Sequence, residues 1–238
     1  DLDSIMGSGK TRKAIEYMNS HPKQKWWYIT PYLDETQRVA EACASINMKV
    51  PANGGEDGKG NIPKKYDLID FIYSGENIVC THSLFLQLKQ EESILRSIKK
   101  HKYNLIVDEA LDVIRDEEIY KDDIKSMHDS GVFSVGDTGI IKWLNESYGG
   151  AFSRIMKDTI TGNVYLHGKD EALIWMLKSQ IFSAFSSIYV LTYMFRGTGM
   201  RMYFDFFGME YSLMHISDGL VKEGVADDPG IKARIMNR

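Results

Sequence analysis

The sequence predicts an α/β fold in which a mainly parallel sheet is flanked by helices. Apolar, β-branched segments alternate with segments of helical periodicity along most of the chain, as in folds built from successive strand–helix units. A glycine-containing loop, residues 4–11, precedes the first helical segment. A later apolar run ends in two carboxylates, Asp108 and Glu109. Such a run is typical of a buried parallel strand whose C-terminal end faces a ligand crevice.

The loop before the first helix, residues 12–19, has the features of a phosphate-binding loop, the Walker A element. Its glycines let the backbone N–H groups turn inward around an anion. Lys10 can reach the β- and γ-phosphates, and the hydroxyl of Thr11 can hold Mg²⁺. Ser4 stands where the full pattern has glycine, and an ordinary turn before Lys-Thr is the alternative. The residues expected to bind nucleotide are Met6, Gly7, Ser8, Gly9, Lys10 and Thr11.

The next elements continue the alternation. The aromatic and β-branched segment Lys25–Thr30 predicts a strand that Pro31 ends. Either Trp26 or Trp27 could stack on a base, although an apolar strand places at least one in the core. The spacing of apolar residues predicts helices, and short apolar runs predict strands. These give a helix over 33–46, an exposed loop over 51–65, a strand over 77–81, and helices over 83–88 and 93–101.

The Asp108 strand has the features of a Walker B element. Asp108 would contact Mg²⁺ through its water shell, and Glu109 would polarise the attacking water as a general base. The alternative is a strand that simply ends in solvent. Because the pair follows a phosphate-binding loop, we expect Lys10, Asp108 and Glu109 to form the catalytic set, with Thr11 and Asp108 at the metal.

The second half of the chain is less regular. Residues 112–168 predict a helical insertion, with helices over 116–127 and 140–156. Its aromatic residues Trp143, Tyr148 and Phe152 are expected in a local core rather than on a functional surface. Residues 173–185 then predict a mostly helical segment, followed by strands over 187–192 and 210–216 and a charged tail.

Composition limits the possible classes. The chain has 238 residues, 43% of them hydrophobic and 26% charged, which is an ordinary globular balance. The net charge of −4 gives no global basic field, so nucleic-acid binding would depend on local patches. Cys43 and Cys80 lack metal-ligand spacing and are expected to be reduced, and no apolar run approaches a membrane span. We therefore expect a cytoplasmic protein, in the host cytoplasm if a phage encodes it.

Segments in a consistent order carry a resemblance to a known family. They are Met6–Thr11, Ile29-Thr30-Pro31-Tyr32, Cys80-Thr81-His82-Ser83, Asp108-Glu109-Ala110-Leu111 and Val190–Phe195. In this order they resemble the first RecA-like ATPase lobe of a superfamily 2 (DEAD/DEAH-like) helicase of the kind often found in phages. The chain departs from the family pattern at Leu111, where Asp or His is usual, and at Tyr193, where a small residue is usual.

The resemblance implies an ATP- and Mg²⁺-dependent hydrolase that contacts a single- or double-stranded nucleic acid, DNA more than RNA. Thr192 would couple the nucleotide site to the bound strand. Residues 1–217 would form the lobe, and 218–238 a tail or linker toward a second RecA-like lobe in the same or a longer chain. The upstream residues that commonly bind adenine are expected before Asp1. The nucleic-acid contacts implied are Thr30, Pro31, Arg38, Thr81, His82 and Ser83. The alternatives are a strand end at Thr30-Pro31 and a helix N-cap at Thr81-His82-Ser83.

Other functions fit part of the same pattern. A phage DNA-packaging ATPase also has Walker A and B elements, with a nuclease domain downstream. A P-loop small-molecule kinase needs an arginine lid, for which Arg196 and Arg201 are the candidates. A nucleotide-gated interaction module would bind ATP and barely hydrolyse it. Polynucleotide-stimulated ATP hydrolysis separates the helicase from these alternatives.

Overall fold

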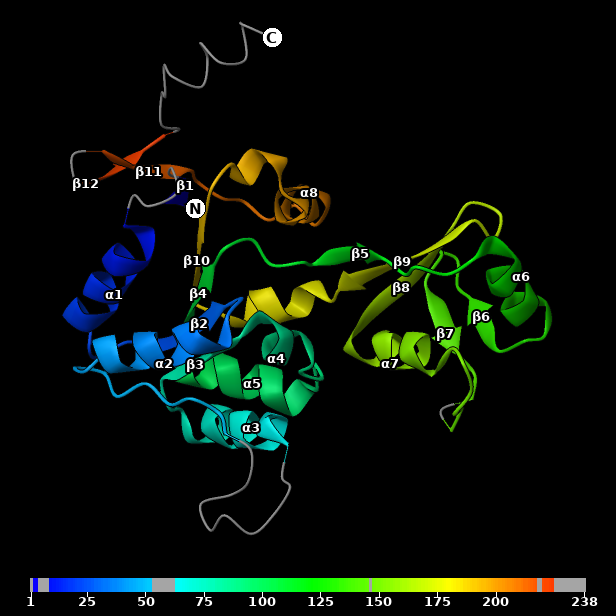
Figure 1. Ribbon diagram of the computed structural model, residues 1–238, viewed down its shortest axis with the longest axis horizontal. Coiled ribbons are helices and arrows are strands. Elements are labelled where there is room, and N and C mark those ends of the chain that lie inside the picture. Colours follow the sequence, from blue (N-terminus) through cyan, green and yellow to red (C-terminus); the bar gives the residue numbers. More distant parts are fainter. Residues whose placement is uncertain (1, 4–8, 53–62, 146, 218–219, 225–238) are drawn as a thin grey trace, which may run out of the picture.

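The main body of the protein is a seven-stranded sheet (Figure 1). The computed structural model describes residues 2–3, 9–52, 63–145, 147–217 and 220–224. Every neighbouring pair of strands is parallel except the last two strands in the sequence, residues 214–217 and 220–223, which form an antiparallel hairpin. The predicted α/β class with a mainly parallel sheet is therefore confirmed. The strand order is β12 (Leu220–Glu223), β11 (Met214–Ser217), β1 (Leu2–Asp3), β10 (Ser187–Thr192), β4 (Tyr103–Asp108), β2 (Lys25–Thr30) and β3 (Ile78–Thr81).

Helices cover both faces of this sheet because its strands are apolar on both sides. One face packs against α1 (Lys10–Ser20) and α2 (Leu33–Ala42), whose buried side chains share a core with Trp26 and Tyr28. The other face contains Trp27 and Ile29. It packs against α3 (Lys64–Ser74), α4 (His82–Leu86), α5 (Glu92–His101), the 3₁₀ helix η1 (Ser179–Ala184) and α8 (Gly199–Phe206), with the short η2 (Phe195–Gly197) preceding α8.

The two tryptophans of β2 lie on opposite faces of the sheet. Successive side chains point to opposite faces of a sheet, so Trp26 joins one core and Trp27 the other, and both are fully buried. Neither is available to stack on a base. Cys43 and Cys80 are both buried free thiols, as expected from the sequence.

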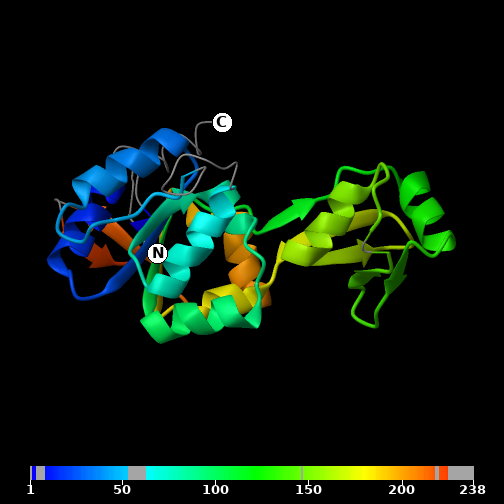
Figure 2. The ribbon, with the colours of Figure 1, turned by 90° about the horizontal axis from the view of Figure 1, so that it is seen from below.

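The insertion was predicted to be helical, but it is a small unit of strands and helices. This is the largest correction to the expected fold. The insertion consists of an antiparallel sheet in the order β5-β9-β8, a hairpin of β6 and β7, and two helices. It projects from one end of the main body, to which β5 and β9 connect it (Figures 1 and 2). Its elements are β5 (Ile114–Asp116), α6 (Lys121–Asp129), β6 (Phe133–Val135), β7 (Ile141–Trp143), α7 (Ser153–Thr161), β8 (Gly162–His167) and β9 (Ala172–Leu177).

Two further expectations in this region were wrong for the same physical reason. Residues 173–185, predicted mostly helical, form β9 and the 3₁₀ helix η1, while 140–156 contains β7 and only the start of α7. A short apolar run fits a buried strand and a buried helix equally well by periodicity. Residues 172–177 form the strand β9 and not a helix because they pair with β8 and β5. Trp143 is buried, and Tyr148 and Phe152 pack against the same core, as predicted.

Smaller corrections concern boundaries. The helix expected over 116–127 begins at Lys121, because Ile114–Asp116 pairs with β9. The strand expected over 210–216 is β11, Met214–Ser217. Part of the expected tail, Leu220–Glu223, is β12 and extends the main sheet instead of leaving it.

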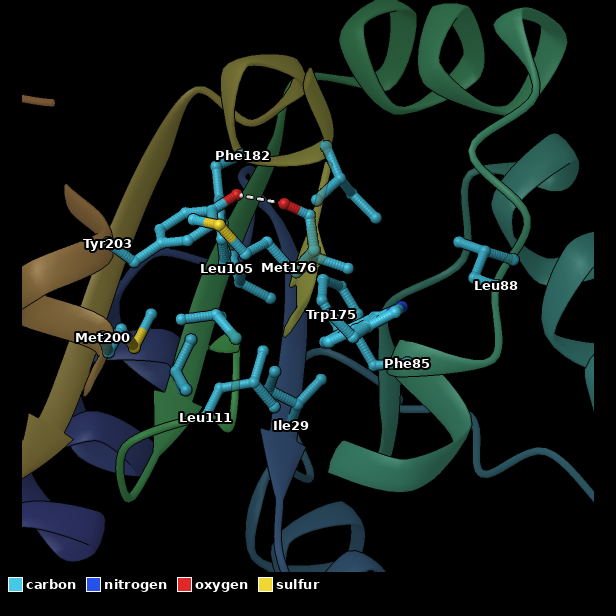
Figure 3. Packing of buried hydrophobic residues seen from close by; sticks show 14 of the residues in the cluster. Ile29, Phe85, Leu88, Leu105, Leu111, Trp175, Met176, Phe182, Met200 and Tyr203 are labelled. Atoms are coloured by element: carbon cyan, nitrogen blue, oxygen red, sulfur yellow. Dashed lines mark hydrogen bonds between the residues drawn. The ribbon is translucent and has the colours of Figure 1, made fainter. Parts of the chain in front are cut away.

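One continuous apolar core joins the main body to the insertion (Figure 3). Trp175 and Met176 of β9 belong to the same buried cluster as Phe85 of α4. Nearby, Tyr203 Oη of α8 donates a 2.9 Å hydrogen bond to the Leu177 carbonyl. The insertion is thereby anchored to the main body through its last strand, β9.

Candidate nucleotide site and adjoining cleft

The carboxyl ends of three neighbouring strands bring the predicted nucleotide-site elements together. In the register of the sheet, Asp3 at the end of β1 is opposite Thr192 of β10, and Leu191 is opposite Asp108 of β4. Loops that follow the carboxyl ends of parallel strands form the usual ligand crevice of such sheets. Thr192 therefore lies between the end of β1 and the Asp108–Glu109 pair.

The described part of the loop ends in a turn that only glycine adopts easily. Gly9 has φ = 80°, in the left-handed region, and caps the start of α1. Its carbonyl accepts the first helical hydrogen bond, from Lys13 N at 2.9 Å. Lys10 opens the helix and is only 7% exposed. Met6, Gly7 and Ser8 lie outside the described residues.

The first turn of α1 meets the end of β4 through side chains. Thr11 Oγ1 lies 3.4 Å from Oδ1 and 3.3 Å from Oδ2 of Asp108. From the neighbouring strand β2, Tyr28 Oη donates a 2.6 Å hydrogen bond to Oδ2 of the same carboxylate. Asp108 is 8% exposed. The structure thus assembles Thr11, Tyr28 and Asp108, from three separate elements, around one buried carboxylate.

Burial and hydrogen bonding act in opposite directions on this carboxylate. Burial raises the pKa of Asp108, whereas the hydrogen bonds from Tyr28 and Thr11 lower it. The pKa of the Tyr28 phenol is raised far above its ordinary value, by burial first and by the Asp108 charge second. Tyr28 therefore remains a proton donor to Asp108 over the whole physiological pH range.

The donor set fits a magnesium ion that arrives with a nucleotide. Mg²⁺ prefers hard oxygen ligands and is usually held by one or two carboxylates plus phosphate oxygens, not by an all-protein cage. Thr11 Oγ1 and the Asp108 carboxylate supply two such oxygens within 3.4 Å of each other. Among the residues that the structure describes, no three His, Cys, Asp or Glu side chains form a metal cluster. The oxygens of Thr11 and Asp108 therefore fit a Mg²⁺ ion bound together with phosphate.

Glu109 has an unusual backbone conformation. Its φ is 63°, which a non-glycine residue rarely adopts, and its side chain is exposed at the end of β4. Its N–H donates a 2.9 Å hydrogen bond to the carbonyl of Leu191, which holds the turn against β10. The adjacent Thr192 is only 2% exposed, and its hydroxyl contacts the Tyr193 carbonyl at 3.5 Å.

The predicted nucleic-acid contacts separate into two groups. Pro31, His82 and Ser83 line one cleft, described below. The others do not line it: Thr30 is buried, and Thr81 caps α4 by accepting a 3.2 Å hydrogen bond from Leu84 N. Arg38 pairs with Glu35 on α2, which packs on the same face of the sheet as α1, the helix that carries Thr11.

The cleft has a volume of about 480 Å³ and is shared by the main body and the insertion. On the main-body side it is lined by residues that follow β2, β3 and β4: Pro31, His82, Ser83, Leu86, Gln87, Leu111 and Asp112. On the insertion side it is lined by Arg115, Lys157, Asp158 and Thr161, from β5 and α7. Burial lowers the pKa of His82 to about 4, so its ring is neutral at pH 7.

A network of charges around the buried Glu117 lies on the insertion side of the cleft. Glu117, whose side chain is fully buried, lies 3.3 Å from Arg115 Nε and 2.8 Å from Arg154 Nη1. Asp158 accepts a 2.5 Å hydrogen bond from Arg115 Nη2. The Arg115 guanidinium also lies 4.1 Å from the ring centroid of Trp175, a cation–π contact. Burial first, and the Asp158 charge second, raise the pKa of Glu117.

Sequence reasoning missed two parts of this region. Tyr28 was expected only as a strand residue, because its contact with Asp108 depends on which strands are neighbours. The cleft residues of the insertion carry no motif and follow from tertiary structure alone. The arginines considered for a kinase lid are tied together locally: Arg201 pairs with Asp205 at 3.2 Å and donates to the Arg196 carbonyl at 3.3 Å.

Comparison with known proteins finds phage-related similarity. Residues 114–175 match the family described as the YonV middle domain, and this range begins at β5 and ends within β9. Over 220 residues the chain is 33% identical to the SPbeta prophage-derived uncharacterized protein YonV of Bacillus subtilis (strain 168). The match covers 89% of this chain and 52% of that protein, so the chain spans about half the length of this relative. No solved structure matches.

No helix in the described part of the chain has the length and apolar character needed to cross a membrane.

Proposed function

We propose that this chain is the ATP-binding lobe, with a RecA-like P-loop fold, of an ATP-dependent nucleic-acid helicase or translocase. The observation that carries the proposal is the approach of Thr11 Oγ1 to the Asp108 carboxylate, at 3.3–3.4 Å. Thr11 lies in the first turn of α1 directly after Gly-Ser-Gly-Lys, and Asp108 ends a buried parallel strand. These are the positions that a Mg²⁺–nucleotide complex requires of a Walker A threonine and a Walker B aspartate.

The proposed roles follow from position. The phosphates lie at the start of α1, where backbone N–H groups and the positive end of the helix dipole favour anions. Lys10 adds a positive charge to the β- and γ-phosphates. Mg²⁺, held by Thr11 and Asp108, supplies charge neutralisation at the phosphates. Tyr28 holds the Asp108 carboxylate in place through its 2.6 Å hydrogen bond.

Glu109 is the proposed general base. Its side chain is exposed beside the buried Asp108, where an attacking water can reach it. Its left-handed backbone conformation costs free energy and is retained when the surroundings enforce it, which is common at functional sites. Thr192, between the end of β1 and this turn, is the proposed link from the nucleotide to the nucleic-acid side.

The proposal includes a second lobe. An arginine that reaches the γ-phosphate from another domain can raise the hydrolysis rate by about 10³- to 10⁵-fold. The relative YonV is about twice as long as the matched region, which leaves room for such a domain in a protein of that length. We therefore expect slow hydrolysis by residues 1–238 alone and faster hydrolysis by the full protein.

The test is Mg²⁺-dependent ATP hydrolysis by the full protein, with and without single-stranded DNA or RNA. Lys10→Ala should lose nucleotide binding, whereas Glu109→Gln should bind ATP and fail to hydrolyse it. Stimulation of the wild type by a polynucleotide, absent from both variants, is the expected result. Hydrolysis that neither polymer stimulates would reject the translocase and leave a kinase or a nucleotide-gated module.

A further inference from the structure

The cleft between the main body and the insertion is built from two walls with different chemistry. The main-body wall contains three of the predicted nucleic-acid contacts, Pro31, His82 and Ser83. The opposite wall, which belongs to the region that matches the YonV middle domain, contains Arg115, Lys157 and Thr161. A ligand in the cleft would touch both walls at once, so the insertion contributes directly to whatever binds there.

The main-body wall offers neutral hydrogen-bond donors. Gln87 Nε2 donates a 3.1 Å hydrogen bond to Ser83 Oγ, which orients the hydroxyl and leaves its own hydrogen for another acceptor. His82 lies on the same wall, and its ring is neutral at pH 7. The wall is therefore suited to a ligand rich in hydrogen-bond acceptors, as a phosphodiester is.

On the insertion wall, the charge of Arg115 is already used within the protein. Glu117 and Asp158 both pair with it, and its guanidinium stacks on Trp175. Lys157 differs, since it is exposed and makes no ion pair within the described part of the chain. The carboxylate of Asp158 is likewise taken up by Arg115. The cation that remains for a ligand on this wall is Lys157.

The size and charge of the cleft favour one strand over a duplex. A volume of about 480 Å³ holds a short backbone segment. A duplex is broader than its major groove, which is about 12 Å wide, and is therefore too broad for a cleft of this volume to enclose. Hydroxyl, amide and ammonium donors bind phosphates without regard to base sequence. Both single-stranded DNA and single-stranded RNA present this chemistry.

The insertion wall is also fixed to the proposed nucleotide site. Asp112 and Arg115, at the cleft, flank the buried Val113, and Leu111 before them is buried in the main core. These residues connect the end of β4, which carries Asp108, directly to β5. The cleft therefore lies along the segment that leaves the Asp108–Glu109 turn.

We propose that the insertion forms the second wall of a single-strand binding cleft, in which Lys157 contacts a backbone phosphate opposite Ser83. This inference rests on the proposed function and adds a region and a residue to it. The juxtaposition of Ser83 and Gln87 of the main body with Lys157 and Thr161 of α7 around one cleft carries it.

The experiment measures binding of fluorescein-labelled oligo(dT) and oligo(U) to the full protein over a range of salt concentrations. Lys157→Gln should weaken binding about fivefold, in line with the loss of one exposed charge-assisted hydrogen bond. It should also reduce the slope of log K against log [salt] by about 0.7, the value for one single-strand phosphate contact. Lys157→Arg, which keeps the charge, should retain the wild-type slope.

The matched control is Lys142→Gln, an exposed lysine of β7 outside the cleft, which should change neither affinity nor slope. A lower affinity with an unchanged slope in Lys157→Gln would overturn the inference, because it indicates a structural effect only. Polymer-stimulated hydrolysis by the wild type together with wild-type binding by Lys157→Gln would reject the inference and keep the proposed function. Neither binding nor stimulation in the wild type would reject both.

Discussion

Removing the Tyr28 hydroxyl is the sharpest test of the proposed metal site. Tyr28→Phe deletes one oxygen from a fully buried side chain and leaves the ring in place. Asp108 then loses its 2.6 Å hydrogen bond and keeps the weaker contacts with Thr11, at 3.3 and 3.4 Å. Since Tyr28 lowers the pKa of Asp108, its removal leaves a less stabilised and less fixed carboxylate.

Tyr28 would affect the Mg²⁺ affinity indirectly, by orienting the proposed metal ligand Asp108. Mutation of a residue that orients a metal ligand typically costs about 10- to 100-fold in metal affinity or activity. Loss of a hydrogen bond to a charged group also costs about 1.5–3 kcal/mol of stability. We therefore expect Tyr28→Phe to need at least about tenfold more Mg²⁺ for half-maximal ATP hydrolysis, the lower limit of that range.

Tyr103→Phe provides a matched control on stability. Tyr103 is also fully buried, and its hydroxyl hydrogen bonds to the backbone carbonyls of Phe71 and Glu76, at the other end of β4 from Asp108. Both variants should lower the melting temperature, measured by thermal denaturation, but only Tyr28→Phe should raise the Mg²⁺ requirement. Equal Mg²⁺ requirements in the two variants would refute the reasoning that Asp108 serves a metal.

Three other predictions concern the stability of the cleft and the insertion. Gly162→Ala should destabilise the protein by about 1–3 kcal/mol in chemical denaturation, because the added Cβ would lie 2.2 Å from Trp175 Nε1. Arg115→Gln should cost about 3 kcal/mol, because it leaves the buried Glu117 with less compensation. The folded pKa of His82, about 4, lies below its ordinary value of 6.5, so the unfolded state binds more protons between these values. Stability should therefore fall as pH drops from about 6.5 to about 4, and less so in His82→Gln.

Each of these has a control that separates it from a general effect. Gly149→Ala adds a Cβ with nothing within 4 Å and should be close to neutral. Lys125→Gln breaks an exposed ion pair with Asp129 and should cost at most about 1 kcal/mol. If Arg115→Gln lowers the free energy of unfolding no more than Lys125→Gln does, the ion pairs of Arg115 with Glu117 and Asp158 do not hold the cleft wall. Parallel pH–stability curves for the wild type and His82→Gln would contradict the assignment of the acid sensitivity to His82.

Local patterns sufficed for much of the main body. The segments around Lys25–Thr30, Tyr103–Asp108 and Ser187–Thr192 are strands where expected, because their apolar, β-branched runs are bounded by turns or charges. The helix after the glycine-containing loop begins at Lys10, and the glycine before it has positive φ. These features depend on residues close together in the sequence.

The parts that sequence patterns missed depend on long-range pairing. The Tyr28–Asp108 hydrogen bond exists because β2 and β4 are adjacent, a fact set by the order of strands and not by either segment. The insertion was expected to be helical because its strands are short and their apolar runs ambiguous. Two of the expected nucleic-acid contacts also have partners within the chain: Thr81 caps α4, and Arg38 pairs with Glu35. Their role toward a nucleic acid stays a prediction.

The path of the chain gives the insertion a place in the proposed mechanism. β4 and β10 are neighbours in the sheet, yet the chain between them runs through the whole insertion. It leaves from the Asp108–Glu109 turn and returns to the strand that ends at Thr192. A displacement of this turn on nucleotide hydrolysis would act on β5 through the buried Leu111 and Val113, and packed cores transmit such shifts instead of absorbing them. On the proposed function, the cleft wall that carries Lys157 is therefore the part of the insertion expected to respond to the nucleotide.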